Sequence, residues 1–283
     1  RYREPPLPEG GLALFVSQSG ETLDTLEALR YCKRKNQKIL SIVNAIESTI
    51  ERESDLVLHT LAGPEIGVAS TKAFTTQLTT LACIALSLAV KKGALDKDKA
   101  SKLAEELRHI PQQITELLHA EEQTQTVKKI AKDLYKSSDM LYLGRNLLFP
   151  LAMEGALKLK EVSYIHAEGY AAGELKHGPI ALIDDDMPIV VLAPGNDPFF
   201  EKTASNLQEN VARGAQVLLI SDEYGQNKLK DFTRWSITVQ EVDPFVAPII
   251  YSVPIQLFAY YVAVTKGTDV DQPRNLAKSV TVE

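Results

Sequence analysis

Residues 12–29 read LALFVSQSGETLDTLEAL, and this stretch decides our interpretation of the fold. The apolar run that opens it predicts a buried strand, and the leucines that close it at helical spacing predict a helix. Between them lies a short turn, Ser17–Thr22, that is rich in hydroxyl groups. A strand, such a turn and a helix together place backbone N–H groups and the positive end of a helix dipole where an anion can bind.

The composition of this turn indicates which kind of anion it suits. Ser17, Ser19 and Thr22 supply hydroxyl donors, and Gly20 lets the backbone approach a ligand closely. The turn contains no Lys or Arg and lacks the Gly-Lys-Ser/Thr ending of a nucleotide-binding loop. It therefore favours a sugar monophosphate held by neutral donors. The alternative is an ordinary helix N-cap, because Ser and Thr are common at that position.

Strand-like and helix-like segments alternate along the chain. The alternation predicts an α/β protein, with doubly wound parallel sheets and helices on both faces. The expected strands are 12–16, 38–44, 56–60, 140–143, 188–193, 216–221 and 235–239, and the expected helices are 24–35, 70–91, 151–163, 199–213 and 247–265.

The two halves of this pattern can be superimposed as a repeat. Strands 12–16, 38–44 and 56–60 match the last three strands of the second half, whereas 140–186 has no counterpart in the first. The first module therefore appears without its opening strand, helix and next strand. We expect a first module with linker helices over 1–125, a second over 126–268, and a C-terminal tail over 269–283.

Charge and composition exclude several classes of function. The 31 basic residues are scattered among 37 acidic ones, which argues against a nucleic-acid surface. The two cysteines have no ligand-like spacing and are expected to be free thiols in a reducing compartment. No signal peptide is recognisable after Arg1. The longest apolar run, 81–90, is too short to span a bilayer and is expected to be a buried helix.

A second group of polar residues lies at helical spacing in 151–163. Glu154, Lys158 and Glu161 fall on one predicted helix face, four and three residues apart. One interpretation is a solvated ion-pair ladder of little energetic weight. The other is a general base held beside a cation.

The segment that follows, 164–179, reads YIHAEGYAAGELKHGP and contains two of the five histidines. Histidine is the side chain best suited to proton transfer near neutral pH. His177 precedes Gly178-Pro179 and is expected on a loop, where catalytic groups concentrate. The spacing does not resemble a metal site, and the three aspartates of 184–186 are expected to form an exposed acidic turn.

The C-terminal stretch, DQPRNLAKSVTVE, is the third feature. Its apolar residues can hold the tail against the fold, which places Lys278 in a partly desolvated environment. A desolvated lysine can attack a carbonyl and form a Schiff base. The alternative is an ordinary surface lysine in a frayed tail.

Together these segments resemble one family, glucosamine-6-phosphate synthase, also called glutamine–fructose-6-phosphate aminotransferase (isomerizing). The resemblance covers essentially the whole chain, as the isomerase half built from two sugar-isomerase (SIS) modules. It rests on several long motifs in order, which are 17–22, 65–75, 154–161, 166–179 and 269–283.

The resemblance implies roles for particular residues. Phosphate contacts are implied for Ser17, Gln18, Ser19 and Thr22, and sugar contacts for Val68, Ser70 and Ala277. Lys278 would form the Schiff base with open-chain fructose 6-phosphate, Glu161 would move the proton between C1 and C2, and Lys158 would assist proton transfer to a sugar oxygen. His177 would open the sugar ring and reach into the partner subunit's site, which implies a homodimer.

The resemblance also implies the wider reaction. Ammonia from a covalently linked glutaminase domain, absent here, would convert fructose 6-phosphate to glucosamine 6-phosphate, the first step of hexosamine and UDP-N-acetylglucosamine synthesis. The enzyme would be cytoplasmic, use no cofactor or metal, and bind glucose 6-phosphate as well as substrate and product. Without its opening segment, the chain alone is expected to be impaired or inactive. The alternatives are a related SIS-domain amino-sugar-phosphate deglycase or isomerase, and a non-catalytic sugar-phosphate-binding module.

Overall fold

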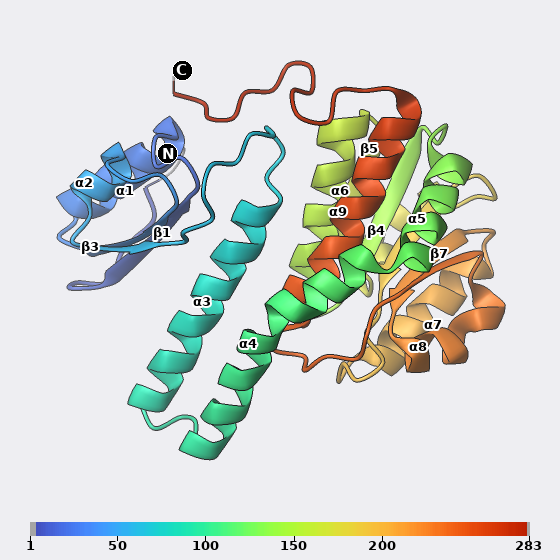
Figure 1. The fold of residues 1–283 in the computed structure, drawn as a ribbon, viewed down its shortest axis with the longest axis horizontal. Helices are drawn as coiled ribbons and strands as arrows, with labels where there is room; N and C mark the ends of the chain where they lie inside the picture. Colours follow the sequence, from blue (N-terminus) through green and yellow to red (C-terminus); the bar gives the residue numbers. More distant parts are fainter. Residues whose placement is uncertain (1–3, 282–283) are drawn as a thin grey trace. The chain divides into compact units, whose positions relative to one another are not determined.

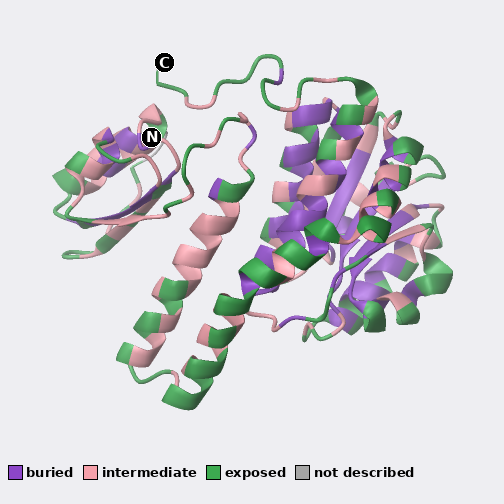
Figure 2. Cartoon of the chain, in the orientation of Figure 1, coloured by how far each residue is buried: buried purple, intermediate pink, exposed green. Residues whose placement is uncertain are grey.

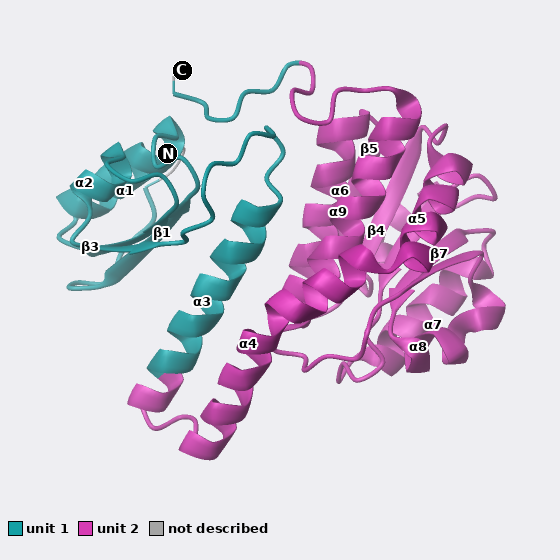
Figure 3. Cartoon of the chain, in the orientation of Figure 1, with its two compact units in different colours: residues 1–88, 275–283 teal, residues 89–274 magenta. Residues whose placement is uncertain are grey.

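The structure, a computed structural model, describes residues 4–281 and divides the chain into two units (Figure 1, Figure 3). Unit 1 comprises Arg1–Leu88 and Asn275–Glu283, and unit 2 comprises Ala89–Arg274. Residues 1–3 of the predicted first module and residues 282–283 of the predicted C-terminal tail lie outside the described residues. Each unit is built on a parallel sheet, as the alternating pattern predicts.

Unit 1 contains a three-stranded sheet in the order β1-β2-β3. Its elements are β1 (Leu12–Ser17), α1 (Leu23–Arg34), β2 (Lys38–Val43), α2 (Thr49–Glu53), β3 (Leu56–His59) and the start of α3 (Lys72–Lys91). Leu26 and Leu29 of α1 pack with Ile39, Val43 and Ile50 in a small core. Each such apolar side chain contributes about 1.5–3 kcal/mol when fully buried, so this core orients α1 on the sheet.

Successive side chains of β1 point to opposite faces of the sheet in unit 1. Ala13 and Phe15 pack against the core formed with α1. Leu12, Leu14 and Val16 point the other way and are exposed, Leu12 by 64%. One face of this strand therefore carries exposed apolar side chains.

Unit 2 contains a five-stranded parallel sheet in the order β5-β4-β6-β7-β8. Its strands are β4 (Asp139–Gly144), β5 (His166–Ala171), β6 (Pro188–Leu192), β7 (Gln216–Ser221) and β8 (Trp235–Thr238). Its helices are α4 (Lys97–His119), α5 (Glu121–Leu134), α6 (Leu148–Ser163), α7 (Phe200–Val211), α8 (Glu223–Leu229) and α9 (Ala247–Lys266), with short 3₁₀ turns at Glu174–His177, Pro179–Leu182 and Lys230–Phe232.

Both faces of this larger sheet are covered (Figure 2). One face packs against α7 through a core that includes Leu143, Val191 and Leu207. On the other face, α6 packs on β4 and β5, and α9 packs on α6. Tyr142 is fully buried there and lies so close to Gly155 of α6 that a Cβ on Gly155 would come within 2.8 Å of its ring. The doubly wound architecture predicted for the second module is therefore confirmed.

The topology also supports the predicted repeat. Strands β1-β2-β3 and β6-β7-β8 are both consecutive, parallel and joined by helices. The compact units divide at 88/89 and 274/275 rather than at the expected 125/126 and 268/269. This difference arises because α4 and α5 pack against α9 of unit 2. The module boundaries themselves stay a prediction.

Two expectations from the sequence are corrected by the structure. Residues 166–171, which are not among the expected strands, form strand β5, and His177, expected on a loop, lies at the end of a short 3₁₀ turn. The helix expected to be buried over 81–90 belongs to α3, in which Ala73 is the buried residue among those described. The other residues of α3 are partly buried or exposed, so the expectation of a buried helix is not met in this structure.

Within residues 4–281, two helices, α3 and α9, are long and apolar enough to cross a membrane by length and composition alone. Helix α9 is mostly buried inside unit 2, with 67% of its most apolar window enclosed. A helix that is apolar all round and packed in a core passes the same test as a membrane span. Its apolarity is therefore explained by the core of unit 2.

Candidate active site

The turn between β1 and α1, which we call the 17–22 loop, is stabilised by its own side chains. Ser17 is 8% exposed, and its Oγ accepts a hydrogen bond from Gly20 N–H at 2.9 Å. Ser19 Oγ accepts from Glu21 N–H at 3.2 Å. In both of these bonds the hydroxyl oxygen accepts, so neither bond uses the O–H of the serine as a donor. The loop also ends at Thr22, the N-cap residue of α1, which makes no side-chain capping bond.

Gly20 is required by the close packing of this loop. Its φ is +65°, and a Cβ at this position would lie 2.0 Å from Ser48 Oγ and 2.4 Å from Ser48 Cβ. Ser48 is 4% exposed, and its hydroxyl has no hydrogen-bond partner among the described residues. A residue with a side chain cannot occupy position 20 without displacing the segment that carries Ser48.

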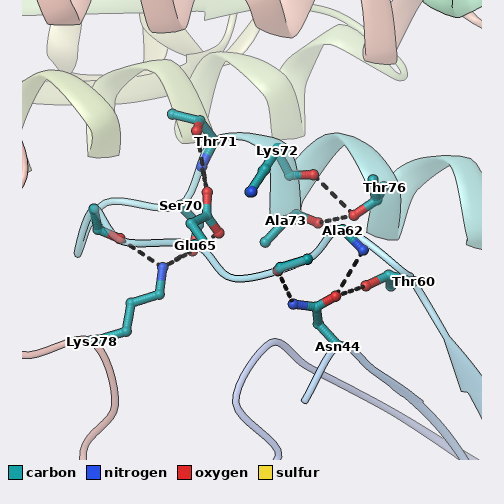
Figure 4. Close-up of polar contacts among 12 residues, drawn as sticks. Asn44, Thr60, Ala62, Glu65, Ser70, Thr71, Lys72, Ala73, Thr76 and Lys278 are labelled. Atoms are coloured by element: carbon teal, nitrogen blue, oxygen red, sulfur yellow. Dashed lines mark hydrogen bonds and ion pairs between the residues drawn. The ribbon is translucent and has the colours of Figure 1, made fainter. Parts of the chain in front are cut away.

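A second loop of unit 1, residues 65–71, lies between β3 and α3. It contains the predicted sugar-contact residues Val68 and Ser70, both partly buried. Glu65 Oε1 accepts hydrogen bonds from Thr71 N–H at 2.7 Å and from Thr71 Oγ at 3.2 Å (Figure 4). Glu65 thereby closes the loop upon itself just before α3 begins.

The C-terminal tail reaches both loops of unit 1. Lys278 Nζ donates to Gly67 O at 2.8 Å and to Ser70 Oγ at 3.4 Å, and it lies 3.4 Å from Glu65 Oε2 (Figure 4). The next residue, Ser279, is hydrogen-bonded through its Oγ to Ser19 Oγ at 3.0 Å. Leu23 N–H, in the first turn of α1, donates to Val280 O at 3.1 Å. Within unit 1, therefore, the tail places a lysine amine beside one loop and touches the other.

These contacts decide between the two interpretations of Lys278. Its side chain is 26% exposed and has three acceptors around its ammonium group. An ordinary lysine of a frayed tail has no such set of partners. The partly desolvated environment predicted from the sequence is therefore confirmed. Ala277, a predicted sugar contact, directly precedes Lys278 in the same segment and is exposed.

In unit 2, α6 brings together the charged residues expected on one face. Lys158 Nζ lies 2.5 Å from Glu161 Oε2 and 3.4 Å from Glu154 Oε1. Lys158 is only 5% exposed, so the interpretation as a solvated ion-pair ladder is wrong. Burial raises the pKa of the Glu154 carboxyl, an effect that the nearby Lys158 partly opposes. The arrangement is a buried cation between two carboxylates, of which Glu161 is the more exposed.

His177 is exposed to solvent, unlike the buried Lys158 of this cluster. Its side chain is 74% exposed, and its Nε2 lies 4.0 Å from Glu174 Oε2.

The acidic turn of 184–186 is exposed, as predicted. Across residues 4–281, no group of three or more His, Cys, Asp or Glu is arranged to hold a metal ion. Both cysteines, Cys32 and Cys83, are free thiols in this structure.

The second module does not repeat the hydroxyl-rich loop of the first. The segment after β6 reads APGNDP, without Ser or Thr. Its Gly195 N–H donates to Asp222 Oδ2 at 2.6 Å, and Asp222 Oδ1 also accepts from Gly225 N–H at 2.9 Å. A carboxylate of the protein itself thus takes the donors that an anionic ligand would need. Unit 1 is therefore the better candidate for binding phosphate.

Two contacts of this site were not singled out from the sequence. Glu65 and Ser279 lie in segments that the resemblance covers, but neither had a predicted role. The sequence shows Glu65 as an acidic residue in a glycine-containing loop before a helix. That pattern does not indicate which distant basic residue it contacts. The pairing with Lys278 spans more than 200 residues, so only the fold brings it about.

Comparison with known proteins agrees with this geometry. The family described as "SIS domain" matches residues 2–87 and 133–266, which is most of the chain. The fold and the hydroxyl-rich loop thus define a sugar-isomerase class of protein.

Individual relatives narrow the class. The chain is 57% identical to glutamine–fructose-6-phosphate aminotransferase (isomerizing) of Brucella abortus over 283 residues, which is 100% of this chain and 46% of that protein. It is 44% identical to the solved C-terminal domain of glucosamine-fructose-6-phosphate aminotransferase from Francisella tularensis, with a TM-score of 0.89 over 96% of this chain and 76% of that one. Glucosamine-6-phosphate deaminase from Thermotoga maritima is 26% identical, with a TM-score of 0.72 over 98% of this chain and 77% of that one.

The chain therefore belongs to the SIS domain family and, within it, to the glutamine–fructose-6-phosphate aminotransferases. It spans about half the length of the curated relatives that it matches, and it corresponds to their C-terminal half.

Proposed function

We propose that this chain is the isomerase part of a glutamine–fructose-6-phosphate aminotransferase and acts on fructose 6-phosphate. The observation that carries the proposal is the pair of adjacent tail residues in unit 1. Lys278 places an amine beside the 65–71 loop, and Ser279 bonds to Ser19 of the 17–22 loop. A sugar phosphate needs such a combination, because a remote phosphate anchor positions the carbonyl that the amine attacks.

The proposed roles follow the chemistry of each group. Ser17, Gln18, Ser19 and Thr22 hold the phosphate, while Val68, Ser70 and Ala277 contact the sugar. Lys278 attacks C2 of the open-chain ketose and forms a protonated imine, which acts as an electron sink.

The groups of unit 2 then supply proton transfer. Glu161 carries a proton between C1 and C2, because one carboxylate can serve both adjacent carbons. Lys158, held against Glu161, assists proton transfer to a sugar oxygen. His177 opens the sugar ring, and its 74% exposed side chain suits a residue that completes the site of a partner subunit. We therefore infer a homodimer, the commonest symmetric assembly.

The wider reaction extends the proposal beyond this chain. In the full-length protein a linked glutaminase domain supplies ammonia, and the product is glucosamine 6-phosphate for hexosamine synthesis. The two free thiols suit a reducing compartment, which supports a cytoplasmic location.

The test is hydrogen exchange at the reacting carbons. The protein is incubated with fructose 6-phosphate in D₂O, and NMR follows deuterium incorporation at C1 and C2. We expect incorporation with the unaltered protein and its loss in Glu161→Gln, with retention in Glu201→Gln, which changes an exposed carboxylate on α7. Binding without incorporation in the unaltered protein would instead support a non-catalytic sugar-phosphate-binding module.

A further inference from the structure

Glu65 is a buried carboxylate whose two oxygens have different surroundings. Its side chain is 4% exposed. Oε1 accepts two hydrogen bonds from Thr71. Oε2 is fully enclosed, has no hydrogen-bond donor among the described residues, and lies 3.4 Å from Lys278 Nζ (Figure 4). Burying a charged oxygen is costly unless a partner compensates it, so the nearby ammonium explains why Oε2 is tolerated there.

Lys278 has one charged neighbour among the contacts that the structure gives it. The other two acceptors around its ammonium are a peptide carbonyl, Gly67 O, and a hydroxyl, Ser70 Oγ. All three acceptors belong to the 65–71 loop. The loop therefore presents three acceptors to a group that has three N–H donors.

We propose that Glu65 is a positioning residue that acts through Lys278, holding its ammonium before the reaction and serving as counter-ion of the protonated imine afterwards. The proposal rests on the proposed function, in which Lys278 forms a Schiff base with a ketose phosphate.

The atom balance of that step shows what Glu65 contributes. The ammonium and the ketone C=O give a protonated C=N bond and one water, so the positive charge is conserved while N–H donors fall from three to one. The remaining N–H can keep one strong acceptor. Glu65 is the charged acceptor of the three and lies 3.4 Å from Nζ, so its carboxylate stays beside the conserved positive charge as counter-ion even while Gly67 O accepts the remaining N–H.

This role differs from that of the phosphate-binding residues. Among the described residues, the polar contacts of Glu65 are with Thr71 and Lys278 rather than with the 17–22 loop. Removing its charge while keeping its shape should leave phosphate anchoring intact and weaken imine formation. Binding and covalent capture are therefore expected to separate.

The experiment compares Glu65→Gln, Glu65→Asp and Glu47→Gln with the unaltered protein. Glu47 is an exposed carboxylate of the same unit and serves as the matched control. Calorimetry gives the Kd for fructose 6-phosphate, and borohydride reduction followed by peptide mass spectrometry gives the rate of adduct formation at Lys278.

For Glu65→Gln we expect a Kd within about threefold of the unaltered protein and an adduct rate lower by roughly tenfold or more, the effect of about 1.4 kcal/mol that a partly buried ion pair can supply. Glu65→Asp recovers part of the rate, and Glu47→Gln behaves like the unaltered protein. An unchanged adduct rate in Glu65→Gln, or an equal loss of binding and capture, overturns the inference. Failure of the unaltered protein to form any adduct would instead count against the proposed function.

Discussion

Replacement of Gly20 by alanine tests whether the 17–22 loop is as tightly packed as the structure indicates. Two costs arise at this position. A left-handed backbone costs an L-residue about 1–2 kcal/mol. The new Cβ would also lie 2.0 Å from Ser48 Oγ, and such overpacking costs about 1–3 kcal/mol. We therefore expect Gly20→Ala to lower the stability of unit 1 by about 2–5 kcal/mol.

The chain offers a matched control for the backbone cost alone. Gly10 has the same φ of +65°, but nothing lies within 4 Å of the Cβ that an alanine would add. Gly10→Ala should therefore lose only about 1–2 kcal/mol. A second control removes the obstacle, because Ser48→Gly deletes both clashing atoms, and the Ser48 hydroxyl has no hydrogen-bond partner to lose among the described residues. The double variant Gly20→Ala/Ser48→Gly should fall back to the Gly10→Ala level.

Native-state hydrogen exchange read by mass spectrometry is the suitable assay. The single tryptophan, Trp235, lies in unit 2, so its fluorescence does not report on the small core of unit 1. Exchange of peptides from α1 and β2 gives the local opening free energy. Equal protection in Gly20→Ala and Gly10→Ala, or no rescue by Ser48→Gly, would refute the packing argument.

Three further predictions concern single side chains. Ser17→Ala leaves the buried Gly20 N–H without its acceptor and should cost about 1–3 kcal/mol in local opening free energy, measured by the same exchange assay; an unchanged value would contradict it. The raised pKa of Glu154 means that the folded state binds its proton more tightly, so its contribution to stability is present at low pH and is lost as pH rises through the folded pKa. Relative to the unaltered protein, Glu154→Gln should thus gain stability as pH rises from about 4 to about 8, in urea unfolding followed by Trp235 fluorescence, and a trend of opposite sign would be evidence against it. His177→Asn should leave unfolding unchanged because this side chain is 74% exposed, yet slow glucosamine 6-phosphate formation from the cyclic sugar in a coupled assay of the full-length enzyme.

The strands were predictable where β-branched and leucine side chains form short runs. Strand β6 contains Ile189, Val190 and Val191, and the structure buries all of them. Strand β5 escaped prediction because its sequence, HAEGYA, contains no such run. Gly169 explains this composition, since a Cβ there would lie 2.5 Å from the Met153 Cα of α6. Small residues in β5 serve close helix packing, which a local pattern does not reveal.

The spacing of some candidate residues was predictable from the sequence, but the groups that they contact were not. Helical spacing correctly placed Glu154, Lys158 and Glu161 on one face of α6. It did not reveal that Lys158 is buried, because burial depends on elements packed from elsewhere in the chain. The acceptors of Lys278 were equally invisible, since the bond to Gly67 O joins residues 211 positions apart.

The central claim is that the 17–22 loop binds the phosphate of the substrate. Its most direct test is a thermal-shift titration of the protein with fructose 6-phosphate, with plain fructose as the control ligand. A ligand that binds only the folded state raises the melting temperature by mass action. We predict a rise with the phosphate ester alone, weakened in Ser19→Ala and retained in Ser101→Ala, an exposed serine of α4. An equal rise with fructose, or a full rise in Ser19→Ala, would contradict the assignment of this loop as the phosphate site.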